Sequence, residues 1–316
     1  MSAAARRGVA LLLAIVTLLL LSLRLSSRAP TALPLVIVVS PTHDRLTRYA
    51  DTLHLQLTLQ AALSLPQAPR IEWLLVEDGP LPDPAILSLL HRSNIPHHYF
   101  HQLTPPKTEH RGLAQRNRAL DLIRRKGLDG IVYFADDDNA LRPELLSELA
   151  RIPKDSYTIF PVGNTGYFGF EGPVLVAQGS SSTSAEQDDQ GAVQIQQWCC
   201  DFCRRRWNVD MGGLAFHSSL LHSSPPLAFN PLAEAGFLET DLLEQFEALN
   251  ATLTFLPRLM DEVHVWHDHS VPFYKAGFYD QDWRTEGVLS RKLMSKNEVA
   301  RGFSWANNSL PVGRML

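Results

Sequence analysis

Three consecutive carboxylates, Asp136, Asp137 and Asp138, are the residues of this sequence whose spacing most directly indicates chemistry. Adjacent carboxylates repel one another, and a divalent cation bound by their oxygens relieves that repulsion. Because side chains alternate along an extended segment, Asp136 and Asp138 are expected to point the same way. Such a pair is suited to hold a divalent ion, directly or through water, and the ion can hold a diphosphate. The alternative is an acidic, solvated turn.

The residues before the acids favour the metal-site hypothesis. Residues 131–134 are Ile-Val-Tyr-Phe, a short apolar run typical of a buried strand. The acids therefore lie at the carboxyl end of a strand, where ligands bind in open α/β sheets. Two further predicted strands, residues 35–40 and 71–76, are followed by Pro-Thr-His-Asp-Arg and by Glu-Asp-Gly. Three polar strand ends on one sheet edge predict a nucleotide-binding crevice.

The elements that position these residues alternate between strand and helix, which is typical of a doubly wound α/β sheet. An amphipathic helix at 239–249 is expected to turn Leu242, Leu243, Phe246 and Leu249 inward, with Thr240 as its N-cap. The other expected elements are helices at 46–63, 81–93 and 111–126 and strands at 97–100, 157–162, 194–198, 253–256 and 263–266. The paired glycines Gly212 and Gly213 allow a close backbone approach.

Several charged residues outside the acidic run are candidates for the same chemistry. Arg111, at a helix entrance, and Arg116 are suited to contact a diphosphate, or they belong to a solvated basic helix. Glu239 lies at a predicted helix entrance, where the helix dipole helps to keep it ionised, so it is either a general base or a plain first-turn acid. His267 and His269 flank an aspartate and are metal ligands, phosphate contacts or solvated side chains.

Composition limits the classes of protein. The chain has 316 residues and a net charge of −4, enough for one large α/β domain or two lobes, and no basic stripe points to a nucleic-acid partner. Its three cysteines, Cys199, Cys200 and Cys203, do not make a disulfide framework. They form one disulfide or stay as buried thiols, with a zinc site as the less favoured alternative.

The N-terminus predicts a membrane anchor. Arg6 and Arg7 precede an apolar run at 8–23, which is short for a spanning helix, and the charge favours a luminal body. A cleaved signal peptide is the alternative. Asn250 and Asn307 lie in glycosylation sequons. The expected organisation is a cytosolic tail (1–7), a transmembrane anchor (8–23), a stem (24–34), two halves (35–150 and 151–285) and a C-terminal tail (286–316).

Taken together, eight stretches of the sequence resemble the β1,3-glucuronosyltransferases of glycosyltransferase family 43. They are residues 41–45, 73–78, 111–117, 132–139, 170–173, 209–213, 239–243 and 265–267, in the order of the family, over a body of roughly 35–272. The resemblance implies a GT-A fold, an α/β architecture with a mostly parallel central sheet, in a type II Golgi membrane enzyme. It also implies transfer of glucuronic acid from UDP-glucuronic acid to a terminal β-galactose, with inversion, using manganese or else magnesium, and it makes a homodimer plausible.

The resemblance implies that the first half (35–150) binds a nucleotide sugar and that the second (151–285) is the acceptor-binding and catalytic half. It also implies a role for each candidate residue. Asp138 would hold the metal, and Glu239 would be the general base. The donor would contact Thr42, Asp78 (at the uracil), Arg111, Arg116, Asp136, Asp137 and His267, and the acceptor would contact Glu171, Arg205 and Asp210.

The sequence also departs from the family. His269 stands where the family has an arginine, the Ser/Thr/Asp-rich segment before Gln194 looks inserted, and Arg204 and Arg206 compete with Arg205 for its role. Xylose transfer to xylan, as in plant members of the family, a non-catalytic luminal glycan-binding protein and a metal-dependent phosphohydrolase remain as alternatives.

Overall fold

The computed structural model describes residues 34–106, 112–163, 170–175, 195–198, 205–234 and 236–267. The chain divides into Met1–Pro34 and a compact unit, Leu35–Leu316, and the described elements belong to the second. The predicted anchor at 8–23, the cysteine cluster, Arg111, His269 and Asn307 lie outside the described residues. None of the described helices combines the length and the apolar character needed to cross a bilayer.

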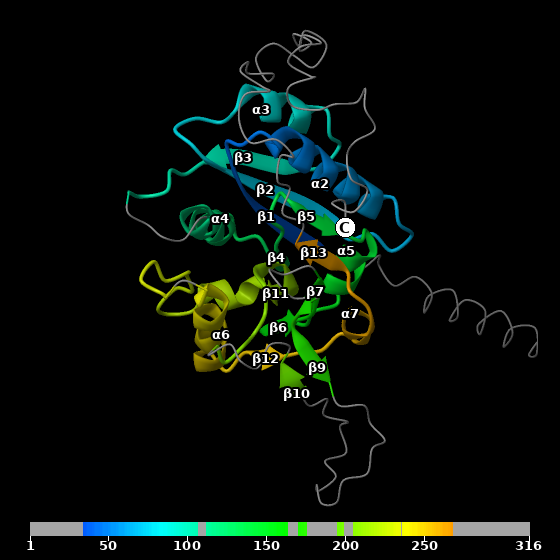
Figure 1. Ribbon diagram of the computed structural model, residues 1–316, viewed down its shortest axis with the longest axis vertical. Helices are drawn as coiled ribbons and strands as arrows, with labels where there is room; N and C mark the ends of the chain where they lie inside the picture. Colours follow the sequence, from blue (N-terminus) through cyan, green and yellow to red (C-terminus); the bar gives the residue numbers. More distant parts are fainter. Residues whose placement is uncertain are drawn as a thin grey trace, which may run out of the picture. The chain divides into compact units, whose positions relative to one another are not determined.

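A seven-stranded, mostly parallel sheet forms the centre of the unit, which confirms the predicted α/β class (Figure 1). Strand β1 pairs in parallel with β2 and β4, whereas β11 runs antiparallel to its neighbours β4 and β6. In spatial order the strands are β12 (Thr252–Leu253), β6 (Ser156–Ile159), β11 (Leu214–His217), β4 (Ile131–Phe134), β1 (Leu35–His43), β2 (Arg70–Asp78) and β3 (His97–His101). The carboxyl ends of β1, β2 and β4 consequently meet at one edge.

A smaller sheet brings the C-terminal end of the described chain beside the acidic turn. Its order is β5 (Asn139–Leu141), β13 (Val265–His267), β7 (Val162–Gly163) and β8 (Phe170–Glu171). His267 pairs with Asn139, the residue directly after the three acids. A hairpin of β9 (Pro173–Leu175) and β10 (Ile195–Trp198) adds two more strands.

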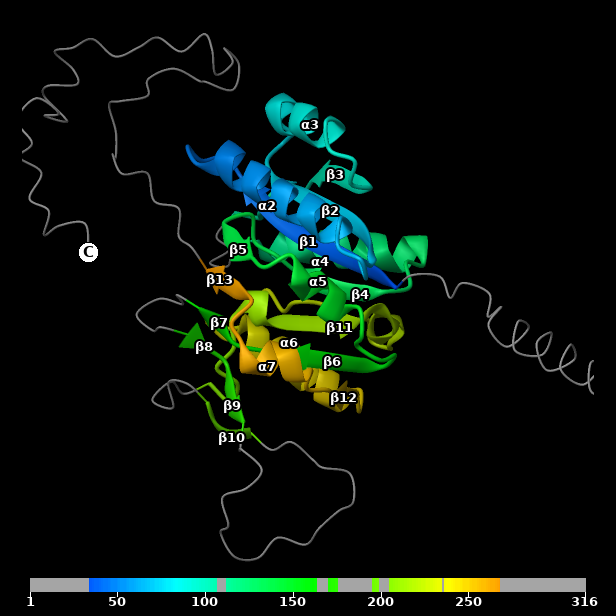
Figure 2. The ribbon, with the colours of Figure 1, turned by 90° about the vertical axis from the view of Figure 1, so that its right-hand side faces the viewer.

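Helices cover both faces of the central sheet, and alternate residues of each strand fill the two cores. From β1, Val36 and Val38 belong to one core and Ile37 and Val39 to the other. The first core includes α2 (Arg48–Leu63), α3 (Pro84–His91), α5 (Glu144–Leu149) and α7 (Pro257–Asp261), and the second includes α4 (Leu113–Lys126), α6 (Leu238–Ala248) and the 3₁₀ helices η1 (Met211–Gly213) and η2 (Ser218–His222). Figures 1 and 2 show the strands β1 and β2 between α2 and α4.

Several strand boundaries differ from the predictions. The strand expected at 253–256 is shortened to β12, and the strand expected at 263–266 is β13, which begins at Val265. Strand β1 continues past Ser40 to His43, so the expected loop residue Thr42 pairs with Glu77. A proline in this strand is tolerated because the pairing with β4 ends at Val39, which leaves Pro41 on an open edge. The single strand expected at 157–162 is divided between β6 and β7, with Pro161 between them.

The start of α6 also differs, because Thr240 is not the N-cap. The helix begins at Leu238, the N-cap position is Phe237, and no side chain caps it. Thr240 is buried in the first turn and donates its hydroxyl to the Trp207 carbonyl at 3.4 Å. Glu239 is therefore a first-turn residue of the helix. The inward positions were predicted correctly, since Leu242, Leu243 and Phe246 are buried and Leu249 packs against them.

Candidate active site

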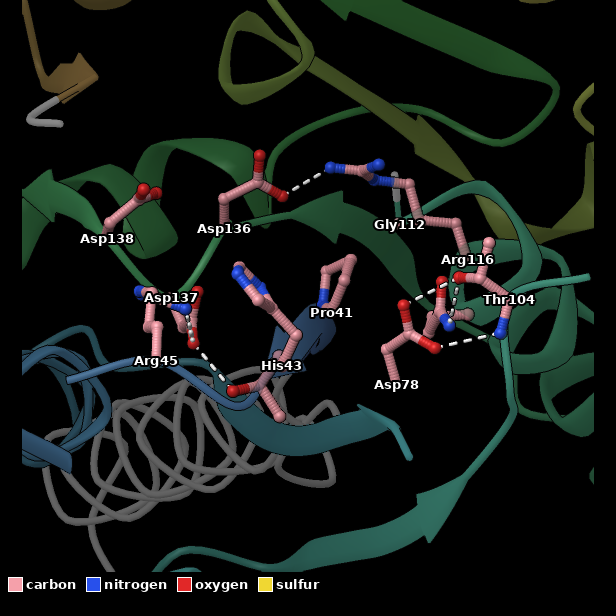
Figure 3. A pocket seen from close by; sticks show the side chains of 12 residues that line it. Pro41, His43, Arg45, Asp78, Thr104, Gly112, Arg116, Asp136, Asp137 and Asp138 are labelled. Atoms are coloured by element: carbon pink, nitrogen blue, oxygen red, sulfur yellow. Dashed lines mark hydrogen bonds and ion pairs between the residues drawn. The ribbon is translucent and has the colours of Figure 1, made fainter. Parts of the chain in front are cut away.

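A cavity of about 330 Å³ lies where the strands β1, β2 and β4 end, as the polar strand ends predicted (Figure 3). It collects residues from five separate segments of the chain. They are Pro41, Thr42, His43, Arg45, Asp78, Thr104, Gly112, Gln115, Arg116, Asp136, Asp137 and Asp138. The cavity is thus rich in carboxylates, guanidinium groups and neutral hydrogen-bonding groups, a combination suited to a charged, polar ligand.

Asp137, the middle acid, faces the protein and holds two loops together. Its Oδ2 accepts hydrogen bonds from Thr42 Oγ1 at 2.7 Å and from Arg45 at 2.9 Å, and the residue is 5% exposed. Burial raises the pKa of Asp137, and the Arg45 charge opposes that rise. Arg45 also forms an ion pair with Asp51 at 2.8 Å. These bonds fix the acidic turn to the loop after β1.

Asp136 is neutralised by Arg116. The two side chains form an ion pair, and Arg116 is only 6% exposed although it is a cation (Figure 3). Arg116 comes from the first turn of α4, which begins after Gly112 in a left-handed conformation with φ 75°. Glycine adopts that conformation without strain. The guanidinium is thereby held at the cavity wall, beside the carboxyl end of β4.

Asp138 is the acid that remains to hold a cation. It has no hydrogen-bond partner within the described part of the chain. Burial, followed by the charges of Asp136 and Asp137, raises its pKa to about 6. A bound cation would offset both the cost of burying an ionised carboxylate and the repulsion from the neighbouring acids, so the site fits a metal.

The donor set also limits how a metal would be held. No group of three or more His, Cys, Asp or Glu side chains that could hold a metal ion occurs among the described residues. A cation at Asp138 would therefore draw most of its ligands from water and from the oxygens of a bound molecule. Magnesium and manganese commonly bind beside phosphates with few protein ligands.

Asp78, at the end of β2, faces the opposite wall of the cavity. Both of its carboxylate oxygens accept hydrogen bonds from Thr104, one from the backbone N–H at 2.8 Å and one from the hydroxyl at 2.6 Å. Gln115, from the first turn of α4, donates to the Thr104 hydroxyl at 3.1 Å. Hydrogen bonds from neutral partners therefore fix the Asp78 carboxylate in this wall.

His267 extends the site beyond the cavity. Its Nδ1 lies 2.9 Å from Asp210 Oδ2, and this hydrogen bond is the main reason why the pKa of His267 is raised to about 9. The charges of Asp136 and Asp138 act in the same direction, against the effect of burial. At neutral pH the imidazole is consequently a cation, which binds phosphate and does not coordinate a metal.

The backbone of η1 positions Asp210. Its other carboxylate oxygen caps η1 by accepting the Gly212 N–H at 2.8 Å. Burial disfavours its charge, but the His267 hydrogen bond and charge and the Gly212 N–H outweigh burial and lower the pKa of Asp210. The close approach expected at the paired glycines is confirmed, because a Cβ on Gly213 would collide with the carbonyl oxygen of Phe160.

Glu171 and Arg205 form an ion pair that connects β8 with the segment before η1. Glu171 is 8% exposed, and burial raises its pKa, with Arg205 opposing. Arg206 instead binds Glu247 through two hydrogen bonds of 2.7 and 2.9 Å, and its guanidinium lies over the Trp207 ring. Of the rival arginines, Arg205 is thus the one that reaches this site, while Arg204 lies outside the described residues.

Glu239 lies within the electrostatic influence of both groups of residues. Burial raises its pKa to about 7, the charge of Asp210 adds to the rise, and Arg116 and Arg205 oppose it. The backbone N–H at the helix start favours the ionised form of Glu239, as expected, but burial has the larger effect on the pKa. A carboxylate with a pKa near 7 exchanges a proton readily at neutral pH.

The structure therefore divides most of the predicted residues between two adjoining groups. The cavity contains Thr42, Asp78, Arg116, Asp136, Asp137 and Asp138. The second group contains Glu171, Arg205, Asp210, Glu239 and His267, which interact electrostatically around Asp210. Asn250 lies apart, exposed and with φ 54° in the turn after α6.

Sequence reasoning assigned no site role to six residues of the cavity wall, and three of them, Arg45, Thr104 and Gln115, make hydrogen bonds that hold the site together. The other three are Pro41, His43 and Gly112. Arg45 and Gln115 fall inside stretches that carry the family resemblance, which was a usable signal. Thr104 lies in a polar loop without a motif. Only its contact with Asp78 identifies it.

Comparisons with known proteins identify the family. The model described as "Glycosyltransferase family 43" matches residues 61–270. Galactosylgalactosylxylosylprotein 3-beta-glucuronosyltransferase 3 of Mus musculus is 32% identical over 263 residues, 75% of this chain and 71% of that protein. The human protein of the same name is 34% identical over 237 residues, 68% of this chain and 64% of its own length.

A solved structure, S. aureus TarS 1-349, covers 73% of this chain and 59% of its own length with a TM-score of 0.43 and 15% identity, and no argument rests on that likeness. The sequence matches, in contrast, show the family, because the family model and the two relatives each cover most of the chain. The chain belongs to glycosyltransferase family 43.

Proposed function

We propose that the protein is an inverting glucuronosyltransferase, which moves glucuronic acid from UDP-glucuronic acid to the 3-hydroxyl of a terminal β-galactose. The observation that carries the proposal is Glu239, a carboxyl with a pKa of about 7, within the field of Asp210 and Arg116. Similarity to proteins named galactosylgalactosylxylosylprotein 3-beta-glucuronosyltransferases supports this donor and acceptor class. We assign the body to the GT-A type of nucleotide-sugar-binding fold.

The cavity holds the donor in this proposal. Asp78 contacts the base, and Arg116 and the protonated His267 contact the diphosphate, where their charges stabilise the negative charge that grows on the leaving group. Asp138 holds a divalent cation, manganese or magnesium. The cation, when bound, supplies Lewis-acid stabilisation of the leaving diphosphate.

The second group of residues receives the acceptor. Glu171 and Arg205 offer a carboxylate and a guanidinium to sugar hydroxyls, and Asp210 lies beside them. Glu239 takes the proton of the attacking hydroxyl as the new bond forms on the face of the anomeric carbon opposite the diphosphate. A single displacement inverts the configuration at that carbon. No second carboxylate nucleophile is required.

We also propose that residues 8–23 anchor the protein in the Golgi membrane as a single-pass type II protein with a luminal body. The exposed position of Asn250 supports this orientation, because a luminal sequon must be accessible to be glycosylated. Glycosidase digestion of the expressed chain should shift its electrophoretic mobility, and Asn250→Gln should reduce that shift. An unglycosylated wild-type chain would count against a luminal body.

The full-length chain, purified in detergent, tests the function directly. It is incubated with manganese, a panel of UDP-sugars, and either a Galβ1,3Gal acceptor or a xylo-oligosaccharide, and products are read by mass and by the anomeric NMR signals. The proposal predicts β-linked glucuronic acid on the galactose acceptor only. Transfer of xylose to the xylo-oligosaccharide would show that the donor and the acceptor are not the proposed ones. Binding of UDP-sugar without transfer to either acceptor would contradict catalysis of this reaction.

A further inference from the structure

We infer that Thr104 and Gln115 are positioning residues that orient the Asp78 carboxylate so that the site selects uracil over other bases. The inference rests on the proposed function, because it assumes that the nucleotide of a sugar donor enters this cavity. Three observations carry it: the two hydrogen bonds from Thr104 to Asp78, the hydrogen bond from the buried Gln115 amide to Thr104, and the place of all three residues in the cavity wall.

Thr104 grips both oxygens of Asp78. Its backbone N–H donates to Oδ1 at 2.8 Å and its hydroxyl donates to Oδ2 at 2.6 Å, as the dashed lines in Figure 3 show. Two bonds from one residue fix the plane of a carboxylate, which a single bond leaves free to rotate. Each oxygen still has a lone pair to accept a further donor. Asp78 is therefore held in place and remains able to accept.

Gln115 determines the direction of the Thr104 hydroxyl. The amide is fully buried, at 0% exposure, and its Nε2 donates to the Gln102 carbonyl at 2.6 Å and to Thr104 Oγ1 at 3.1 Å. Because Thr104 Oγ1 accepts from Gln115, its own proton is directed to Asp78. Gln115 Oε1 is buried without a hydrogen-bond partner among the described residues, so the amide acts on the site through Thr104.

The backbone holds this chain of bonds in register. Gln102 donates its N–H to the Glu77 carbonyl at 2.9 Å, which continues the pairing of β2 and β3 beyond the end of β3. Thr104 follows two residues later and so lies beside Asp78, the last residue of β2. Gln115 reaches the same place from the first turn of α4. Secondary structure, not the ligand, therefore sets the geometry.

The chemistry of the bases gives this geometry its selectivity. Uracil presents an N3–H donor between two carbonyl acceptors, and a carboxylate accepts that donor. Cytosine presents a bare N3 acceptor at the same position, which a fixed carboxylate repels. A freely rotating carboxylate would turn away from cytosine and lose part of this discrimination. A site that fixes a polar group rejects analogues that leave the group unpaired.

The test measures nucleotide binding by the full-length chain with manganese present, using UDP, CDP and ADP as the probes in calorimetry. Thr104→Val keeps the shape and the backbone N–H but removes the hydroxyl. We expect roughly tenfold weaker UDP binding, because the nucleotide must then order a carboxylate that the wild type already holds in place, and a smaller ratio of CDP to UDP dissociation constants. Thr104→Ser should retain both values. Gln115→Met should move them in the same direction as Thr104→Val.

The matched control is Thr158→Val, because Thr158 is buried and its hydroxyl has no partner among the described residues. It should leave the affinities for UDP and CDP unchanged. If the wild-type protein binds UDP but the ratio of CDP to UDP dissociation constants is the same in Thr104→Val, the inference is overturned and the proposed function stands. A wild-type protein that binds no UDP would overturn both. Equal melting temperatures for Thr104→Val and wild type exclude misfolding as the cause.

Discussion

Replacing Asp210 by Asn should lower the pKa of His267 more than any other single change at the site. The hydrogen bond to Asp210 is the largest cause of the raised pKa, and the Asp210 charge adds to it. The amide of Asn keeps the shape and the capacity to accept from the imidazole, but it removes the negative charge. Asp136 and Asp138 still favour the imidazolium, so the pKa does not fall completely to its ordinary value.

The size of the effect follows from the pKa of about 9, against 6.5 for an ordinary histidine. That difference corresponds to about 3 kcal/mol of preference for the charged imidazole, at 1.36 kcal/mol for each pH unit. Since the folded pKa is raised, the stabilisation is complete below about pH 6.5 and is lost as the pH rises through about 9. Asp210, whose pKa is lowered, adds stability that is lost only in acid.

The assay is an NMR titration of the metal-free chain with labelled histidine. The sequence has 12 histidines, so the signal of His267 is assigned by its disappearance in His267→Gln. Asp121→Asn is the matched control, because Asp121 is exposed and forms an ion pair with Arg124 on the surface of α4. A wild-type His267 that titrates near 6.5, or one whose pKa is the same in Asp210→Asn, would refute the reasoning.

Three further changes test separate parts of the structure. Glu239→Gln should lower kcat by about 10²–10⁴-fold and leave the UDP-sugar affinity unchanged. The kcat of the wild type should rise with pH through about 7, as Glu239 loses its proton. A near-normal rate in the variant would refute the assignment of Glu239 as the base. Asp138→Asn should abolish the manganese-dependent part of UDP binding in calorimetry, and persistence of that part would move the metal elsewhere. Arg48→Met should lower the free energy of unfolding, measured in urea, by about 3–5 kcal/mol, because it removes the cation that pairs with the buried carboxylate of Glu77. The control Arg142→Met breaks an exposed ion pair and should lower that free energy by about 1 kcal/mol or less. Equal losses in the two variants would contradict this account.

The central strands were predictable because both faces of β1, β2 and β4 are covered. Such strands read as unbroken apolar runs, which local sequence reveals directly. The direction of β11 was not predictable, because its pairing with β4 and β6 joins segments far apart in the chain. The first residue of α6 was misjudged for a related reason. Threonine is a common N-cap residue, but the Thr240 hydroxyl donates instead to the Trp207 carbonyl, a tertiary contact.

The acidic residues of the site were predictable from their type, whereas their division of labour was not. Three adjacent aspartates indicate a cation site, but only the structure shows which residues bind each of them. Thr42 and Arg45 bind Asp137, and a residue of α4 binds Asp136, so Asp138 is the acid that we propose for a metal. The partners lie far from the acids in sequence, so no local pattern encodes them.

The ion pair between Arg116 and Asp136 bears on turnover. In the proposed reaction, a diphosphate that contacts Arg116 would displace the Asp136 carboxylate, and the same carboxylate would compete for the guanidinium once sugar transfer is complete. This competition limits how tightly the spent nucleotide is retained, because the empty site has its own internal anion to return to. Product release governs the rate of many enzymes. Under the proposed function, the pair would therefore weaken product inhibition and would also lower the affinity for the incoming donor.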